Sequence, residues 1–173
     1  GASIQSACQV KNIEYPNNYQ FSYNYMAASQ FIVDQFYTKH GVLMEEDKTF
    51  DHDNRKTIVG VPTDDYHKGY FIPDDQEVTV KEYLDREPRF YAWIATDRSL
   101  WRTYGMLYQM RLRFNQWAGG GSQASGGEYY QTGIAIKKWV HPETQNLFWE
   151  RIVVFPFPLI RLSDLYLMYA EAL

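Results

Sequence analysis

The chain has 173 residues, a net charge of −4 and 45% hydrophobic residues, with 5 Trp, 15 Tyr and 10 Phe. This hydrophobic content with so small a net charge excludes an intrinsically disordered chain, and 17 Lys and Arg against 21 Asp and Glu are too few for the basic surface that binds nucleic acid. The single cysteine, Cys8, excludes an intrachain disulfide and a cysteine-based zinc site.

Two helices are predicted in the first half of the chain. Apolar residues recur at helical spacing over residues 29–38, and Gly41 follows closely enough to end that helix. Thr79 and Glu82 have the spacing of a capping box, in which each side chain bonds the free backbone amide of the other residue. The helix that they begin must be short, because Pro88 ends it within about two turns.

The segment between these helices, residues 45–75, is predicted to be an acidic, loop-rich region. Its carboxylates suggest a calcium site, since calcium takes closely spaced oxygen ligands; they are Glu45, Glu46, Asp47, Asp51 and Asp53. A calcium loop of the helix-loop-helix kind needs glycine at its sixth position, and counted from Asp51 that position is Lys56. A solvated loop is therefore the favoured interpretation.

A strand is predicted over residues 108–114, where apolar and polar residues alternate with a period of two. Residues 133–139 are its predicted partner. The connecting segment 119–127 is rich in Gly and Ser, and ordering such a chain costs much backbone entropy. We therefore expect a flexible loop there.

The last predicted element is an amphipathic helix at the end of the chain. Ser163 or Asp164 can cap it, and its apolar stripe, which we expect to be buried, consists of Leu165, Met168, Tyr169 and Ala172. An ion pair between Arg161 and Asp164 is available on the first turn. The longest apolar stretch, residues 153–160, precedes this helix and is far shorter than the ~20 residues that span a bilayer.

The sequence contains no strong motif for a catalytic or metal site. The four histidines lie in separate polar segments, and no predicted helix carries two of them at metal-ligand spacing. The doublets 64–65 and 74–75 are adjacent aspartates, which point in opposite directions on an extended segment and so do not form the carboxylate pair of a glycosidase. We therefore predict no catalytic residue, no metal site and no cofactor.

Aromatic residues near loops and strand ends are the strongest candidates for ligand contacts. Flat rings stack on the apolar faces of sugars, and polar neighbours such as Asp97, Arg98 and Arg102 can bracket the hydroxyl groups. The rings that flank the Gly/Ser-rich loop are the predicted glycan contacts: Trp101, Tyr104, Trp117, Tyr129 and Tyr130. For any single ring, core packing is the alternative, because aromatic side chains also dominate cores.

Four stretches of the chain resemble a known family. Residues 157–173 place an arginine and an aspartate before an apolar helix that ends in Tyr-Ala-Glu-Ala. This stretch closely resembles the signature of the SusD/RagB family of outer-membrane glycan-binding lipoproteins of the Bacteroidetes. Residues 36–41, 85–91 and 132–139 resemble three further motifs of that family in the same order, with Glu87 in place of an aspartate.

The resemblance implies a mainly α fold with long irregular loops and a small β-hairpin, ending in a tetratricopeptide-type helix. Residues 1–173 would then form a single partial domain of this kind. It also implies a noncatalytic protein on the surface of the bacterial outer membrane. Such a protein binds an oligosaccharide or polysaccharide and delivers it to a SusC-type TonB-dependent transporter.

Family members are held at the membrane by a lipidated N-terminal cysteine, an anchor that this chain is expected to lack. Two alternatives to direct sugar binding stay open. One is a protein-interaction module of the transporter complex. The other is a glycoside hydrolase that uses carboxylates of the loops.

Overall fold

The computed structural model describes residues 8, 26–74, 76–103, 105–116, 118–119, 129–144, 152–156, 158 and 160–173. Its α-helices are α2 (Gln30–Asp34), α3 (Pro88–Trp93) and α4 (Leu162–Ala172), and two 3₁₀ turns are η1 (His67–Gly69) and η2 (Lys81–Tyr83). Its strands are β1 (Ile58–Gly60), β2 (Val78–Val80), β3 (Ile94–Ala95), β4 (Leu100–Thr103), β5 (Met106–Gln109) and β6 (Ala135–Ile136).

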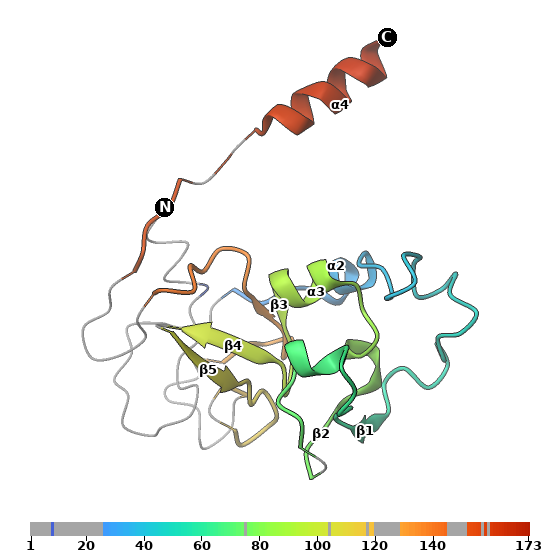
Figure 1. Ribbon diagram of the computed structural model, residues 1–173, viewed down its shortest axis with the longest axis vertical. Helices are drawn as coiled ribbons and strands as arrows, with labels where there is room; N and C mark the ends of the chain where they lie inside the picture. The colour runs from blue at the N-terminus through green and yellow to red at the C-terminus, as the bar shows by residue number, and fades with distance from the viewer. Residues whose placement is uncertain are drawn as a thin grey trace.

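The described strands form three separate antiparallel pairs: β1 with β2, β3 with β6, and β4 with β5. In the last pair, Trp101 lies opposite Tyr108. Figure 1 shows these pairs gathered with α2 and α3 into one body, from which α4 projects. No residue of α4 is buried.

The expectation of a mainly α fold with one small hairpin is wrong. The described α-helices have only five, six and eleven residues, and three two-stranded sheets run through the body. Helices this short gain little stability, because few residues add a hydrogen bond after the costly first turn. Segments such as Val78–Val80 instead carry the β-branched residues that suit a half-buried strand.

The helix predicted over residues 29–38 is confirmed at its start and ends early. Ser29 caps α2, because its hydroxyl accepts a hydrogen bond from the backbone amide of Ile32. The helix ends at Asp34. At this end of the helix the buried guanidinium of Arg86 donates to the carbonyl oxygens of Val33 and Phe36, which satisfies carbonyl groups that a longer helix would have paired.

The capping box predicted at Thr79 is wrong. Thr79 lies in β2, and its buried hydroxyl donates to the carbonyl oxygen of Asp97 at 2.6 Å. Glu82 is also buried and forms an ion pair with Lys56 at 2.6 Å. Pro88 begins α3 rather than ending a helix, since the first helical position needs no backbone N–H donor.

The predicted pairing of residues 108–114 with 133–139 is also wrong. The strand there is β5, which pairs with the adjacent β4, while β6 pairs with β3. Gly105 adopts a positive φ of 72° between β4 and β5, a conformation that favours a tight hairpin turn. Pairing β5 with the adjacent β4 closes a shorter loop than pairing it with residues 133–139, and closing a shorter loop costs less entropy.

The predicted C-terminal helix is present as α4. Its N-cap is Arg161 rather than Ser163 or Asp164, and the backbone N–H of Arg161 donates to Asp164 at 3.0 Å. The expected burial of the stripe is wrong, because α4 projects from the body and Leu165, Met168 and Tyr169 are exposed. The predicted ion pair between Arg161 and Asp164 is confirmed at 3.2 Å. None of the helices in the described ranges is long and apolar enough to cross a bilayer. The predicted Gly/Ser-rich loop lies outside the described residues except for Gly119.

The body contains two clusters of buried hydrophobic residues. The first joins α2 and α3 through Val33, Phe36 and Phe90, and Tyr91 belongs to it. The second is centred on Trp101 and holds its neighbours from β6 and the chain after β5. Tyr91 of the first cluster and Trp101 of the second line the same cavity.

Candidate functional site

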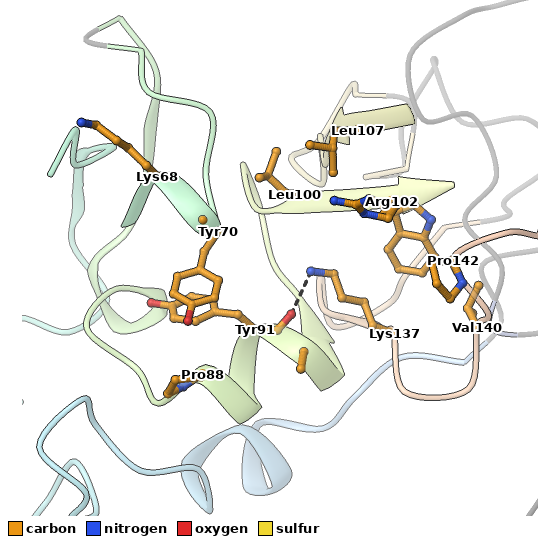
Figure 2. A pocket seen from close by; sticks show the side chains of 13 residues that line it. Lys68, Tyr70, Pro88, Tyr91, Leu100, Arg102, Leu107, Lys137, Val140 and Pro142 are labelled. Carbon is orange, nitrogen blue, oxygen red and sulfur yellow. Dashed lines mark hydrogen bonds between the residues drawn. The ribbon is translucent and has the colours of Figure 1, made fainter. Parts of the chain in front are cut away.

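A cavity of about 530 Å³ lies where η1, α3, the β4–β5 hairpin and the segment after β6 meet (Figure 2). Its volume falls in the range of small-molecule binding sites, about 300 to 1,000 Å³. Tyr91 of the first hydrophobic cluster and Trp101 of the second both line it. The full lining consists of Lys68, Gly69, Tyr70, Pro88, Tyr91, Ala92, Leu100, Trp101, Arg102, Leu107, Lys137, Val140 and Pro142. The cavity is therefore assembled from segments that are distant in sequence.

Two stacked tyrosines form one wall of the cavity. The rings of Tyr70 and Tyr91 have centroids 4.0 Å apart and planes that differ by 16°. The hydroxyl of Tyr91 donates to the carbonyl oxygen of Tyr83 at 2.9 Å, and burial raises the pKa of Tyr91 above its ordinary value. Tyr70 is only half-buried, so part of its ring stays accessible beside this fixed partner.

The wall containing Tyr70 is connected by the backbone to β4. The amide of Leu100 donates to the carbonyl oxygen of Tyr70 at 2.8 Å, and Phe71 pairs with Ser99 in an isolated bridge. These bonds bring η1 against the start of β4. As a result, residues 68–70 and 100–102 line the same cavity.

Lys137 enters the cavity from the segment that follows β6. Its backbone amide donates to the carbonyl oxygen of Trp93 at 2.8 Å, which continues the pairing of β6 with β3. Its Nζ donates to the carbonyl oxygen of Tyr91 at 2.9 Å, as the dashed line in Figure 2 marks. A lysine at the end of a helix interacts favourably with the last carbonyl groups. Burial lowers the pKa of Lys137 to about 8.

Two further cations line the cavity. Arg102 is exposed on β4, opposite Leu107 of β5. Lys68 is exposed on η1 and pairs with Asp65 at 2.8 Å. None of the described lining residues carries a carboxylate. The cavity therefore combines aromatic and aliphatic surface with positive charge and hydrogen-bond donors.

The predicted glycan contacts fall into different environments. Trp101 lines the cavity but is only 1% exposed, and its buried indole Nε1 has no hydrogen-bond partner among the residues that the structure describes. Tyr130 is 2% exposed and packs in the same cluster as Trp101. Tyr129 is exposed. Tyr104 and Trp117 lie outside the described residues.

Two of the polar neighbours expected near a sugar are buried in an ion network instead. The guanidinium of Arg98 pairs with Asp97 and with Glu77, and Arg113 pairs with Asp97 at 2.7 Å. Asp97 also accepts the backbone amide of Leu112 at 3.0 Å. These bonds tie the residue before β2, the turn between β3 and β4, and the chain after β5 together, so the charges serve the fold.

Sequence reasoning missed the residues that give the cavity its character, namely Tyr70, Tyr91 and Lys137. Tyr91 and Lys137 lie within stretches that resemble family motifs, residues 85–91 and 132–139. The resemblance identified the two stretches but did not indicate that they lie side by side in the fold. Tyr70 had no comparable signal, because it follows a polar loop.

The acidic segment uses several of its carboxylates within the fold. Asp47 accepts hydrogen bonds from the hydroxyls of Thr38 and Thr49 at 2.6 and 2.7 Å and contacts His40 at 2.9 Å. Asp51 pairs with Lys81 at 2.7 Å. Over the ranges that the structure describes, no group of three or more His, Cys, Asp or Glu side chains is arranged to hold a metal ion.

Comparisons with known proteins show what the chain resembles. A solved structure of BT4246 matches with a TM-score of 0.68 and 22% identity, over 91% of this chain and 27% of that one. A structure of selenomethionine BT4246 matches with a TM-score of 0.64 and 24% identity, over 84% and 24% of the two chains. The likeness is one of fold, and the chain spans about a quarter of the length of those proteins.

No curated protein sequence matches the chain. The model of the SusD family, in contrast, matches residues 2–173. Because this match covers nearly every residue, the chain belongs to the SusD family.

Proposed function

We propose that this chain takes part in the noncatalytic binding of an oligosaccharide, with the cavity beside Tyr70 and Tyr91 as the binding site. The single observation that carries the proposal is the half-buried Tyr70 ring, stacked on Tyr91 at the wall of a cavity of about 530 Å³. Aromatic faces bind the apolar faces of sugar rings, and nearby donors such as Arg102 select among their hydroxyl groups.

The absence of acidic groups from the described lining favours binding over hydrolysis. Most glycosidases need two carboxylates on either side of the scissile bond. The lining residues described in the structure include Lys68, Arg102 and Lys137 but no Asp or Glu. This chemistry can hold a glycan without cleaving it.

Membership of the SusD family supports a wider setting for this binding. In that setting the whole protein lies on the surface of the outer membrane. It passes the glycan to a SusC-type TonB-dependent transporter. The predicted contacts Trp101, Tyr104, Trp117, Tyr129 and Tyr130 belong to the same proposal, and Trp101 is the one that also lines the cavity.

A glycan array followed by calorimetry with the best ligand tests the proposal. Replacing Tyr70 by Ala removes the accessible ring, and losing a stacking contact of about 1 kcal/mol or more weakens binding roughly fivefold to tenfold. Phe114→Ala is the matched control, since this residue is 77% exposed and is not among those that line the cavity. It should bind like the unaltered chain.

Trp101→Phe tests the indole separately, because it keeps most of the buried ring and removes the unpartnered Nε1 donor. Reduced affinity with an unchanged melting temperature would support a sugar contact by Trp101. If no glycan binds, the proposal fails. Co-purification of a transporter without sugar affinity would then favour the interaction-module alternative.

A further inference from the structure

The charged residues in the described lining of the cavity are all cations. Three of its lining residues are cations, Lys68, Arg102 and Lys137, and none of its described lining residues is an acid. The chain as a whole has the opposite bias, with 21 Asp and Glu against 17 Lys and Arg. The positive lining is therefore a local feature of the cavity rather than a consequence of composition.

Of these three cations, Lys137 is the one with a hydrogen bond to another residue of the cavity lining. It is half-buried, and its Nζ donates at 2.9 Å to a neutral group, the carbonyl oxygen of Tyr91. Among the residues that the structure describes, no carboxylate lies within ion-pair distance of Lys137 or Arg102. Removing an ammonium group from water without an opposite charge is costly. The lowered pKa of Lys137 reflects that cost.

We propose that the cavity is built for an anionic sugar, whose carboxylate or sulfate group binds Lys137 and Arg102 while its ring lies against Tyr70. This inference rests on the proposed function and names the class of glycan for the same site. Figure 2 shows Lys137 and Arg102 entering from different segments beside the Tyr70 and Tyr91 wall.

The physical argument follows from the energetics of charged hydrogen bonds. A neutral sugar offers Lys137 only another uncharged acceptor, whereas an anion supplies the opposite charge that no described residue provides. Charge-assisted hydrogen bonds are shorter and about twice as strong as neutral ones, and an arginine can bind a carboxylate through two donors at once. Lys68 keeps Asp65 as its partner, so its contribution is the weaker one.

Matched pairs of oligosaccharides test this inference by calorimetry on the full chain. The carboxylate arm compares an oligogalacturonide with its methyl ester, which has the same backbone without the charge. The sulfate arm compares a sulfated galactan oligosaccharide with its desulfated form. We expect one acidic ligand to bind at least about tenfold more tightly than its neutral match, the effect of one charged hydrogen bond. The arm that shows this preference identifies the anionic group.

Variants of the lining cations test whether the preference for the acidic ligand comes from this cavity. Lys137→Met and Arg102→Gln should each remove most of the preference for the acidic ligand, whereas Lys137→Arg should keep it. Lys48→Met is the matched control for lost charge, because Lys48 is exposed and outside the lining. Arg102 is exposed, so its variant tests the inference even if a change at Lys137 impairs folding.

The outcomes separate this inference from the proposed function. Equal affinity for acidic and neutral ligands in both arms overturns the inference. So does an acid preference that survives Lys137→Met and Arg102→Gln together. If neutral glycans still bind and Tyr70→Ala still weakens them, the proposed function stands without it. If no glycan binds at all, both fail.

Discussion

The Nη2 of Arg86 donates a hydrogen bond to the carbonyl oxygen of Val33 at 2.6 Å, although the two residues are 53 positions apart in the chain. The same guanidinium donates to the carbonyl oxygens of Phe36 and Glu82 at 2.8 and 3.1 Å, and it lies 4.7 Å from the ring centre of Phe90. Arg86 is fully buried. It therefore joins the end of α2 to the segment that begins α3.

Arg86→Met should destabilise the chain strongly. Three buried carbonyl groups lose a donor, but that of Val33 keeps the backbone amide of Phe36 at 3.3 Å, so the groups left unsatisfied are those of Phe36 and Glu82. Each unsatisfied group costs about 1 to 3 kcal/mol, so the free energy of unfolding should fall by at least about 2 kcal/mol. Arg86→Lys should recover only part of this loss, because an ammonium group lacks the planar fork that reaches several acceptors. Urea denaturation measures both effects.

Arg89→Met is the control for Arg86. The sequence suggests that Arg89 anchors a turn to core carboxylates, but Arg89 is exposed and pairs with the neighbouring Glu87 at 2.8 Å. Its replacement should cost less than about 1 kcal/mol, as is usual for surface ion pairs. Equal losses at Arg86 and Arg89 would contradict the role given to Arg86.

Lys137 should make stability depend on pH in a defined window. Burial lowers its pKa from 10.5 to about 8, so between these values the unfolded chain binds more protons than the folded one. Stability from this group therefore rises with pH across the window and is constant below it. The comparison is between the unaltered chain and Lys137→Met, by urea denaturation at several pH values.

Subtracting the two sets of unfolding free energies isolates Lys137 from the buried tyrosines, which titrate in both proteins. The difference should move in favour of the unaltered chain as pH rises from about 8 to 10. Lys48→Met, which removes an exposed lysine, should show no such trend. A flat difference for Lys137→Met would mean that this lysine is solvated in the folded chain.

Asp47 should contribute stability that acid removes. The hydrogen bond from Thr38 is the largest cause that holds the pKa of Asp47 well below its ordinary value of 3.8, followed by those from Thr49 and His40. A lowered carboxyl pKa stabilises the fold above 3.8, and this contribution is lost as the pH falls below that value. Asp47→Asn should therefore differ most from the unaltered chain near neutral pH.

Urea denaturation between about pH 5 and pH 2 measures this difference for Asp47→Asn. Asp53→Asn is the matched control, because Asp53 is exposed in the same segment. It should leave the pH profile of stability unchanged. If the Asp47→Asn difference stayed constant down to pH 2, the hydrogen bonds of Asp47 would not favour its charged form.

Local signals in the sequence placed several elements correctly. Ser29 predicts the start of α2, and the apolar stripe with Asp164 predicts α4, because capping and helical periodicity act between residues a few positions apart. The same local reasoning failed at Thr79 and Pro88. At Thr79, the pairing of β2 with β1 outweighed a capping pattern. At Pro88, the proline begins α3, because a proline suits the first position of a helix as well as the position after its end.

The candidate site needed long-range contacts that no local pattern contains. Trp101 was predicted as a contact and lines the cavity, whereas Tyr70, Tyr91 and Lys137 become neighbours only when η1, α3 and the chain after β6 meet. Ring stacking and partial burial of an ammonium group depend on distances between residues that are tens of positions apart.

By itself, the sequence determined the family resemblance, the small net charge and the abundance of aromatic rings, because these are properties of residue order and composition. Only the tertiary structure decided which rings are buried and which border a cavity. It placed Trp101 in a core cluster, left part of Tyr70 accessible, and set Lys137 beside the carbonyl of Tyr91. Burial and pairing are decided by the whole packed chain, since hydrophobic contact and desolvation depend on neighbours in space.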